Sequence, residues 1–289
     1  MIWLLLSIAT SSLLYVIFKG FAIYEVNRLH AIVINYLVAC ATGFIAFRGT
    51  IDLTESLESS WILTAAVLGI LFIAIFNCMA LTSQQNGLSV AAVASKMSLV
   101  IPVVAGVLLY DESLGWLKIA GIGLAIIAVY LTSTPTGSPN SSGQASLLYP
   151  ILVFVGSGVI DSLIKYAQQF QVPNSKEPLF SAFCFLFAFL VGCLIMIYEF
   201  IKGRTLSWKS VFAGIVLGIP NYFSIYFLIL ALKGDIDSSS IFPINHVGTV
   251  LITTAIGILL FREKLSRKNY LGVAIAVAGI LLISLTLSN

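Results

Sequence analysis

The sequence predicts an all-α integral membrane protein with ten transmembrane helices arranged as two inverted five-helix repeats. Three observations lead to this fold class. Hydrophobic residues make up 59% of the 289 residues and charged residues only 9%, whereas soluble domains carry about 25% charged residues. The chain contains ten long apolar stretches, and it repeats part of itself. Because so little polar surface is available, we expect the lipid bilayer to be its solvent.

The ten apolar stretches have the length and composition of membrane helices. A helix that crosses about 30 Å of hydrocarbon needs about 20 residues, and it satisfies its own backbone hydrogen bonds. The first stretch has no basic segment before it, so we expect a membrane helix there and not a cleaved signal peptide. In chain order the predicted spans are Ile2–Phe18, Ala31–Phe47, Trp61–Leu81, Leu88–Leu109, Leu114–Leu131, Leu147–Tyr166, Leu179–Ile201, Val211–Leu232, Ser238–Phe261 and Tyr270–Leu287.

The internal copy aligns residues 80–121 with residues 231–272 at a constant offset of 151, without a gap. Each copy contains a long apolar stretch, a short charged turn and a second apolar stretch. In a chain this apolar, such a copy is typical of a duplicated transporter bundle with its substrate site between the halves.

A segment rich in Ser, Gly and Pro, without charges, lies in the middle of the chain at residues 133–146. Its composition predicts a flexible linker. It divides the chain into a first repeat, 1–132, and a second repeat, 147–289, with five predicted helices each. Because five is odd, the second repeat must enter the membrane from the opposite side, which makes the repeats inverted.

The two copied segments resemble the repeat of EamA-type proteins in the drug/metabolite transporter superfamily. The first copy carries the resemblance with Ala80, Leu81, Ser89, Pro102, Glu112, Leu114 and Gly121, and the second with Ala231, Leu232, Ser240, Glu263, Leu265 and Gly272. The copies depart from each other where Pro102 aligns with Thr253 and Pro243 aligns with Ala92. The resemblance implies a secondary transporter, a permease or exporter, that carries a small organic molecule.

The location that we expect is a bacterial plasma (inner) membrane, which the chain crosses many times. Lys and Arg are concentrated in the turns that follow the odd-numbered helices, and the positive-inside rule then places both termini outside. Ten-helix members of the superfamily are usually drawn with both termini in the cytoplasm. The orientation is therefore left open.

Ionisable side chains inside the spans are the first candidates for a substrate site, because each costs roughly 2.5–3.5 kcal/mol or more at membrane depth. Lys96 lies eight residues into its helix, about 12 Å along the axis. Asp161 and Lys165 are one helical turn apart. His246 aligns with Ser95, beside Lys96. We expect these four and three deep asparagines to bind substrate, and Asp161 or His246 to carry a coupling proton; the asparagines are Asn77, Asn221 and Asn245.

Each of these residues also has a structural interpretation. Asp161 and Lys165 can neutralise each other, and Lys165, like Lys19, can extend its ammonium to the membrane interface. His246 and the asparagines can hydrogen-bond neighbouring helices. Glu112 and Glu263 precede helices, where a carboxylate meets the positive helix end.

The substrate class follows from charge. If Lys96, Asp161 and Lys165 share one cavity, its net charge is positive, which favours an anion such as a carboxylate or a phosphate compound. The chain has no Gly-x-x-x-x-Gly-Lys-Ser/Thr loop, so we expect no ATP and no other cofactor. Its four cysteines lack the spacing of a metal site, and no catalytic residues are expected because the two histidines lie far apart.

The expected partners are the lipid bilayer and a small-molecule substrate. A net charge of +3, spread along the chain, gives no support to nucleic-acid binding. The chain is expected to be a monomer or a homodimer, and the spacing Gly214-x-x-x-Gly218 favours internal helix packing over a dimer face. The alternative function is a non-transporting structural membrane protein or a channel.

Overall fold

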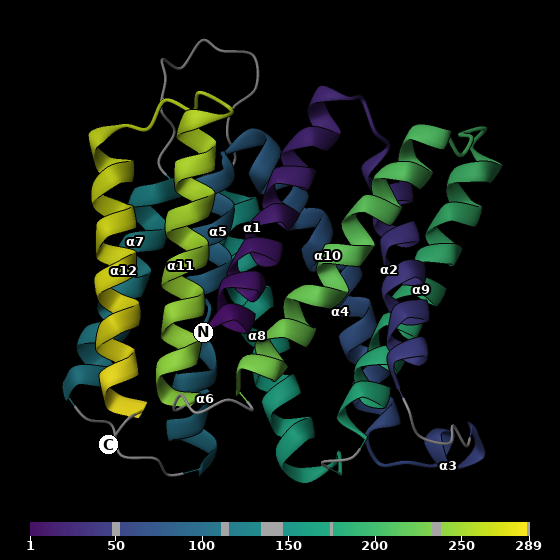
Figure 1. Cartoon of the computed structure of the whole chain (residues 1–289), viewed down its shortest axis with the longest axis horizontal. Helices are drawn as coiled ribbons and strands as arrows, with labels where there is room; N and C mark the ends of the chain where they lie inside the picture. The colour runs from purple at the N-terminus through teal and green to yellow at the C-terminus, as the bar shows by residue number, and fades with distance from the viewer. Residues whose placement is uncertain (48–52, 111–115, 134–146, 174–175, 233–237, 288–289) are drawn as a thin grey trace. The chain divides into compact units, whose positions relative to one another are not determined.

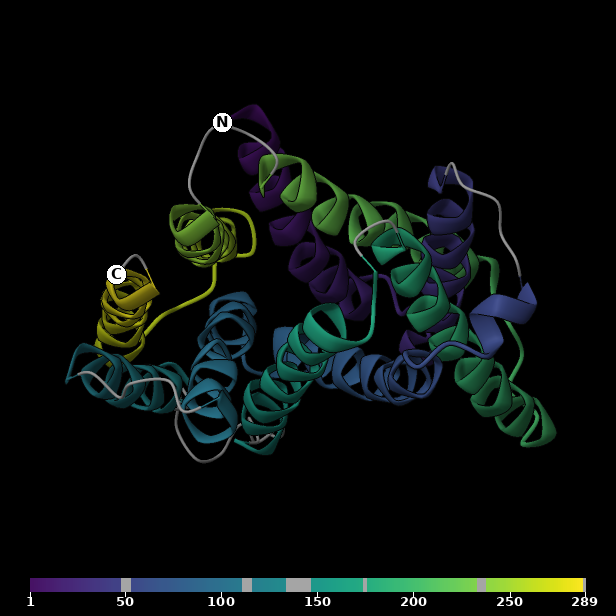
Figure 2. The same cartoon turned by 90° about the horizontal axis from the view of Figure 1, so that it is seen from below.

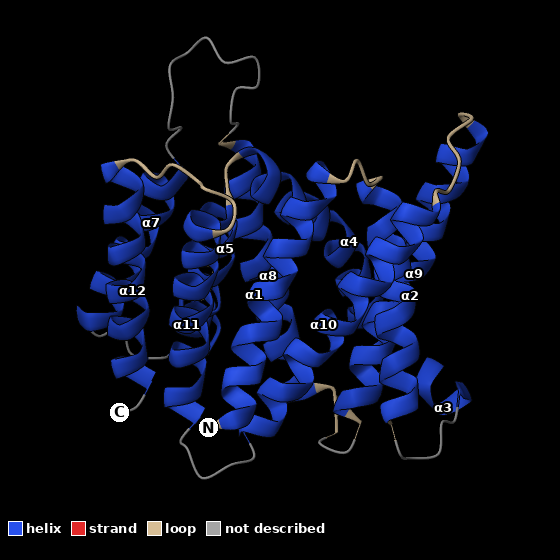
Figure 3. Cartoon of the chain, turned by 45° about the horizontal axis from the view of Figure 1, so that its top comes forward, coloured by secondary structure: helices blue, strands red, loops and turns tan. Residues whose placement is uncertain are grey.

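The computed structural model describes residues 1–47, 53–110, 116–133, 147–173, 176–232 and 238–287. All regular structure in these residues is helical (Figure 3), so the prediction of an all-α protein is confirmed. In chain order the helices are α1 (Ile2–Ile23), α2 (Arg28–Ala46), α3 (Leu53–Leu57), α4 (Ile62–Gln85), α5 (Leu88–Met97), α6 (Val100–Tyr110), α7 (Trp116–Ser133), α8 (Leu148–Phe170), α9 (Glu177–Ile201), α10 (Trp208–Leu232), α11 (Ser238–Leu259) and α12 (Arg267–Leu287) (Figure 1).

Seven helical segments in the described part of the chain are long and apolar enough to cross a membrane. Two shorter apolar helices, Ile119–Ser133 and Ile244–Leu259, accompany them. Together they indicate a multi-pass membrane protein, as the composition predicted. The count of ten spans and their inverted arrangement stay predictions at this level.

The helices differ from the predicted spans in two places. The five-residue helix α3 lies in a segment that was expected to be a turn, and the predicted span Leu88–Leu109 is divided into α5 and α6. Two predicted features lie outside the described residues. They are the linker, except for its first residue, Ser133, and the turn that carries Glu112.

The chain forms two compact units, each of which takes helices from both halves of the sequence. The domain boundaries predicted at residues 132 and 147 are therefore not the boundaries of these units, and the repeat assignment stays a prediction. Both copies of the repeated segment belong to the first unit. The first unit contains Met1–Gly20, Cys78–Gly158 and Phe223–Asn289, and the second contains Phe21–Asn77 and Val159–Tyr222.

The first unit contains a close antiparallel pair, α7 and α12, which lie side by side in both views (Figures 1 and 2). A β-carbon built on Gly121 would lie 2.5 Å from Ile283 Cγ1, and one built on Gly272 would lie 2.7 Å from Thr132 Cγ2. Gly121 and Gly272 are 151 positions apart, and so are Thr132 and Ile283. The same contact is therefore made twice with the roles of the two helices exchanged.

The second unit contains an equivalent antiparallel pair, α2 and α9. A β-carbon on Gly43 would lie 3.1 Å from Ala182 Cβ, and one on Gly192 would lie 2.6 Å from Val33 Cγ2. Here the equivalent residues are 149 positions apart, Gly43 with Gly192 and Val33 with Ala182. The exchange of partners seen in the first unit is thus repeated with other residues.

Two further glycines of the second unit follow the same offset of 149. A β-carbon on Gly69 of α4 would lie 2.6 Å from Phe187 Cβ of α9, and one on Gly218 of α10 would lie 2.7 Å from Val38 Cβ of α2. Gly214, one turn before Gly218, approaches α2 as closely. Both glycines of the Gly-x-x-x-Gly pattern therefore pack inside the chain, as expected.

An aromatic cluster fills the interior of the second unit. The buried ring of Tyr36 on α2 has its centroid 6.4 Å from that of Phe72, 5.5 Å from that of Phe76 and 6.1 Å from that of Phe185. Rings at these separations contribute packing energy beyond their buried area. This cluster joins α2 and α4 to α9.

The close contact of α7 with α12 predicts that Gly121→Ala destabilises the protein. The added methyl group meets the buried Ile283, and overpacking of this kind costs about 1–3 kcal/mol. The matched control is Gly123→Ala on the same helix, where nothing lies within 4 Å of the new β-carbon. The thermal unfolding temperature in detergent should fall for Gly121→Ala and hold or rise for Gly123→Ala. Equal effects would contradict this packing.

Candidate functional site

The predicted fourth span is interrupted at Ser98 and Leu99, between α5 and α6. Pro102 has no N–H, so it cannot bond the Ser98 carbonyl four residues earlier, and the Ile101 N–H donates to that carbonyl at 2.8 Å instead. The Ser98 hydroxyl donates to the Ser95 carbonyl at 2.6 Å. The break is therefore local, and side chains and a tight turn satisfy part of its freed backbone.

His246 on α11 contacts this break from the neighbouring helix. Its Nδ1 lies 3.3 Å from the carbonyl oxygen of Lys96 in the last turn of α5. A carbonyl oxygen only accepts hydrogen bonds, so the ring nitrogen donates, and in neutral imidazole this assigns the proton to Nδ1 and leaves Nε2 as an acceptor. The structure thus brings together Lys96 and His246, the two residues that the repeat alignment placed at matching depths.

Asn245, the residue before His246, bonds Ser7 of α1, and Ser7 in turn bonds α10. Its Nδ2 donates to Ser7 Oγ of α1 at 2.8 Å, and Ser7 Oγ donates to the carbonyl of Ser224 on α10 at 2.9 Å. All three residues are buried. Consecutive positions of α11 therefore hold α1 and α5 through polar contacts at one level of the unit. Sequence reasoning selected Asn245 and missed Ser7, because a serine in an apolar helix is too common to single out.

The two other predicted asparagines lie in the second unit and bond neighbouring polar groups there. Asn77 Oδ1 accepts from Arg28 Nε at 3.2 Å, and Asn77 Nδ2 donates to the carbonyl of Ile73 at 2.9 Å. The buried Asn221 donates through Nδ2 to Oδ1 of the buried Asn35 at 3.1 Å. These contacts join α2 to α4 and α10, which is the helix-bonding role considered for them.

Asp161 and Lys165 lie one turn apart on α8, on a face that is exposed in the structure. Both belong to the second unit, whereas Lys96, Asn245 and His246 belong to the first. The shared cavity of Lys96, Asp161 and Lys165 stays a prediction.

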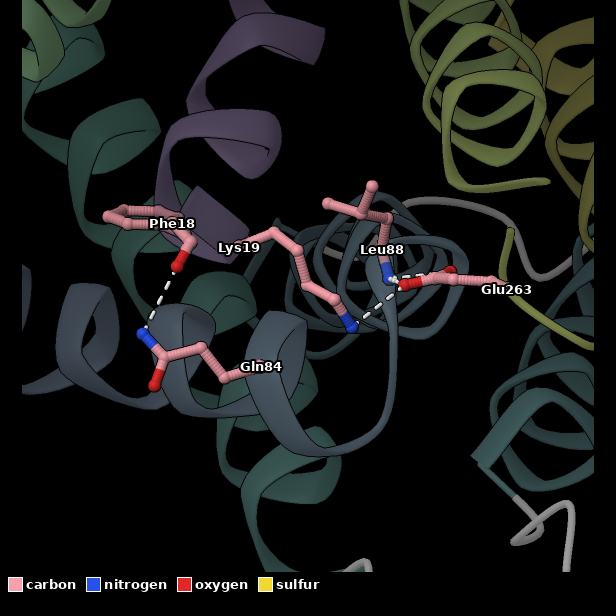
Figure 4. A network of polar contacts seen from close by, with 5 residues as sticks. All are labelled: Phe18, Lys19, Gln84, Leu88 and Glu263. Carbon is pink, nitrogen blue, oxygen red and sulfur yellow. Dashed lines mark hydrogen bonds and ion pairs between the residues drawn. The ribbon is translucent and has the colours of Figure 1, made fainter. Parts of the chain in front are cut away.

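Glu263 has a different partner from the one expected. Its carboxylate accepts the N–H of Leu88, the first residue of α5, at 3.0 and 3.1 Å through its two oxygens. The ammonium of Lys19 on α1 lies 3.0 Å from the same carboxylate. Figure 4 shows these side chains converging from three parts of the first unit. Glu263 therefore meets the positive end of α5, and the expectation that it caps the helix after it was wrong.

Lys19 was expected to extend to the interface, and it forms this ion pair instead. Sequence proximity carries no information about the contact, because Leu88 and Glu263 are 175 positions apart. The signal in the sequence is the glycine before α5, Gly87, which the structure holds at a φ of 110°, a conformation that favours glycine. A β-carbon there would lie 3.0 Å from Glu263 Oε2.

Comparison with known proteins gives one relative of nearly full length. The chain is 32% identical over 285 residues to an uncharacterized protein of Haemophilus influenzae, covering 96% of this chain and 94% of that protein. Over 84 residues it is 36% identical to the multidrug resistance protein EbrB of Bacillus subtilis, covering 29% of this chain and 67% of EbrB. No protein-family model matches the chain.

Solved structures with the same fold include a crystal structure of low sequence identity. It aligns with a TM-score of 0.58 and 18% identity, over 98% of this chain and 96% of the other. A similarity at this identity concerns the fold alone, and it extends over essentially the whole chain.

The contact between His246 and the end of α5 predicts a structural cost for its removal. His246→Ala should destabilise the protein by about 1–3 kcal/mol, because the Lys96 carbonyl loses its donor inside an apolar region. His246→Asn keeps an N–H donor near the Nδ1 position and should recover most of the loss. Thermal unfolding in detergent measures both variants, and an alanine variant as stable as the parent would show that the bond is unimportant.

Proposed function

The chain belongs to the same family as the Haemophilus influenzae protein, and we propose that it is a secondary transporter that moves a small organic metabolite across the membrane by alternating access. The observation that carries the proposal is the broken α5–α6 segment, with Lys96 and His246 at the break. In transporters, discontinuous helices of this kind supply substrate and ion sites near the middle of the membrane. The similarity of an 84-residue segment to EbrB, a multidrug resistance protein, also supports transport.

The arrangement of equivalent helices supports two inverted repeats, 1–132 and 147–289, with ten spans. Repeats of the same orientation would carry equivalent helices in the same direction. Here α7 and α12 run antiparallel and exchange contacts at an offset of 151. The pair α2 and α9 does so at an offset of 149. A two-fold axis in the membrane plane, as in inverted repeats, produces this relation.

An anionic metabolite is the substrate class that we propose, because Lys96 places a positive charge at the helix break. A lysine at this depth is costly unless a partner or a ligand offsets its charge, and an ammonium is a suitable point charge for a carboxylate or phosphate. Asp161 and His246 are the proposed carriers of a coupling proton. The proposed location is a bacterial inner membrane, since the two relatives come from bacteria.

A non-transporting structural protein or a channel is the second candidate, and an enzyme is the least supported. Hydrogen bonds between helices, such as the one between Asn35 and Asn221, are compatible with a transporter, a structural protein or a channel. The interruption of α5–α6, two residues after Lys96, supports a carrier, because interrupted helices supply substrate and ion sites in transporters. We propose no cofactor, and a monomer or homodimer as the functional form.

The anion proposal predicts a specific effect of Lys96→Gln on ligand binding. Purified protein screened against amino acids, sugars, nucleotides and phosphorylated metabolites should be stabilised thermally by an anionic ligand, since a ligand that binds only the folded state raises its stability. Lys96→Gln should lower the affinity for that ligand about 10- to 100-fold, the loss expected for a charge-assisted hydrogen bond. The control is Lys209→Gln, an exposed lysine at the start of α10. Equal affinity for neutral and anionic analogues, unchanged in Lys96→Gln, would overturn the proposal.

The carrier mechanism predicts counterflow. Proteoliposomes loaded with the ligand found in the screen should take up labelled ligand faster than empty vesicles, because a carrier returns loaded more readily than empty. A channel shows no such stimulation, and a structural protein shows no uptake. Absence of both from well-folded reconstituted protein would favour the second candidate.

A further inference from the structure

The Glu263 carboxylate occupies a socket bounded by the backbone of Gly87, Leu88 and Gly257. A β-carbon on Gly257 would lie 2.7 Å from Glu263 Oε2, and one on Gly87 would lie 3.0 Å from the same atom. The Glu263 N–H donates to the Gly257 carbonyl at 2.9 Å, and the Leu88 N–H donates to the carboxylate. Any side chain at either glycine would fill the space. The end of α11 and the start of α5 are therefore shaped to hold this carboxylate.

Two consecutive residues of α1 make polar contacts here, Lys19 with the Glu263 carboxylate and Phe18 with the end of α4. Lys19 pairs with Glu263, and the carbonyl of Phe18 accepts from Gln84 Nε2 at 3.1 Å (Figure 4). The Lys19 and Glu263 side chains are only 21% and 10% exposed. We call the assembly of Lys19, the Leu88 N–H and Glu263 the latch. It joins α1, α5 and the turn after α11 within the first unit.

A line of buried polar groups leads from the helix break to the latch. On α11, Asn245, Thr249 and Thr253 recur every four residues, and the next position in this series is Gly257 in the socket. On α5, Ser89 directly follows Leu88 of the latch at the start of the helix. The Lys96 carbonyl, which His246 contacts, lies at the other end of α5. The name polar seam denotes five buried residues on three helices: Asn245, Thr249 and Thr253 of α11, Ser89 of α5 and Ser12 of α1.

The hydroxyls of Ser12, Ser89 and Thr253 are buried and find no hydrogen-bond partner in the described part of the protein. Buried polar groups in native proteins are nearly always bonded to protein, water or a ligand. Ser12 lies on α1 between Ser7, which is bonded to Asn245, and Lys19 of the latch. Ser12, Ser89 and Thr253 thus place three hydroxyls without a hydrogen-bond partner in the described residues on α1, α5 and α11.

We propose that Glu263 is a gating residue: the latch closes one end of the polar seam, and its opening admits water and substrate to the level of Lys96 and His246. The inference rests on the proposed transport function. Opening needs the loss of one ion pair and of the bonds to a single N–H, and the carboxylate lies in a turn, so no helix has to unfold. Gly87, at a φ of 110°, is the residue at which α5 can change direction.

The test measures access to the seam without any substrate. In protein with all four cysteines replaced, Ser89→Cys places one thiol behind the latch, and a water-soluble maleimide reports its exposure. Glu263→Gln removes the ion pair and should raise the labelling rate at least 10-fold. Lys19→Met should do the same, and the double variant should add little because both changes open one latch. Thr253→Cys serves as the second reporter if Ser89→Cys fails to fold.

Two controls separate gating from loss of stability. Glu55→Gln breaks the ion pair with Lys176 in the second unit and should leave the labelling rate unchanged. Protein that keeps only the buried Cys184 reports global unfolding, and Glu263→Gln should not accelerate its labelling. A lower unfolding temperature without faster labelling of Ser89→Cys would show a purely structural cap and overturn the proposal. Faster labelling without counterflow would keep the gate and reject the transport function.

Discussion

The structure depends on one constraint, that a backbone group inside hydrocarbon must find a hydrogen-bond partner within the protein. Proline removes a donor inside described helices, as Pro102 does in α6 and Pro220 in α10, and at α5–α6 the helix is also interrupted at Ser98 and Leu99. The Ser98 hydroxyl and the imidazole of His246 provide donors near the break. An interruption supported in this way is stable enough to persist, yet it leaves polar backbone next to a lysine. The contact between His246 and the Lys96 carbonyl lies next to this break.

The glycine contacts between helices are repeated in the chain, whereas the residues of the candidate site are not. The glycine contacts occur in equivalent pairs, Gly121 with Gly272 and Gly43 with Gly192. The polar residues occur once: at the offset of 151, Asn245 aligns with Ala94, His246 with Ser95 and Lys96 with Val247. Close helix approach is thus shared by the equivalent helices, whereas Lys96 and His246 each occur once, in contrast to Glu263, which aligns with Glu112. The helix contacts made by glycine are therefore pseudo-symmetric, whereas the residues of the candidate site are not.

The sequence allowed the helices to be predicted because hydropathy is a local property. The repeat alignment placed His246 and Lys96 at matching depths of their helices, and their contact was not predicted. The sequence did not reveal α3, whose five residues are too few for a periodic signal. The partner of Glu263 was missed for another reason. A carboxylate before a helix normally acts on that helix, but the socket between Gly87 and Gly257 exists only after α5 and α11 pack together.

The exchanged glycine contacts have the form of an isologous interface, the kind that two identical chains make about a two-fold axis. In a homodimer every substitution appears in both subunits, so a lysine that is favourable at one position also occupies the equivalent position of the partner subunit. Joining two such copies into one polypeptide removes that coupling. Thr132 and Ile283 occupy equivalent positions and already differ, although both still receive a glycine from the opposite helix. In the inverted repeats that we propose, fusion of the two copies allows a lysine and a histidine to diverge independently while the equivalent glycine contacts are kept.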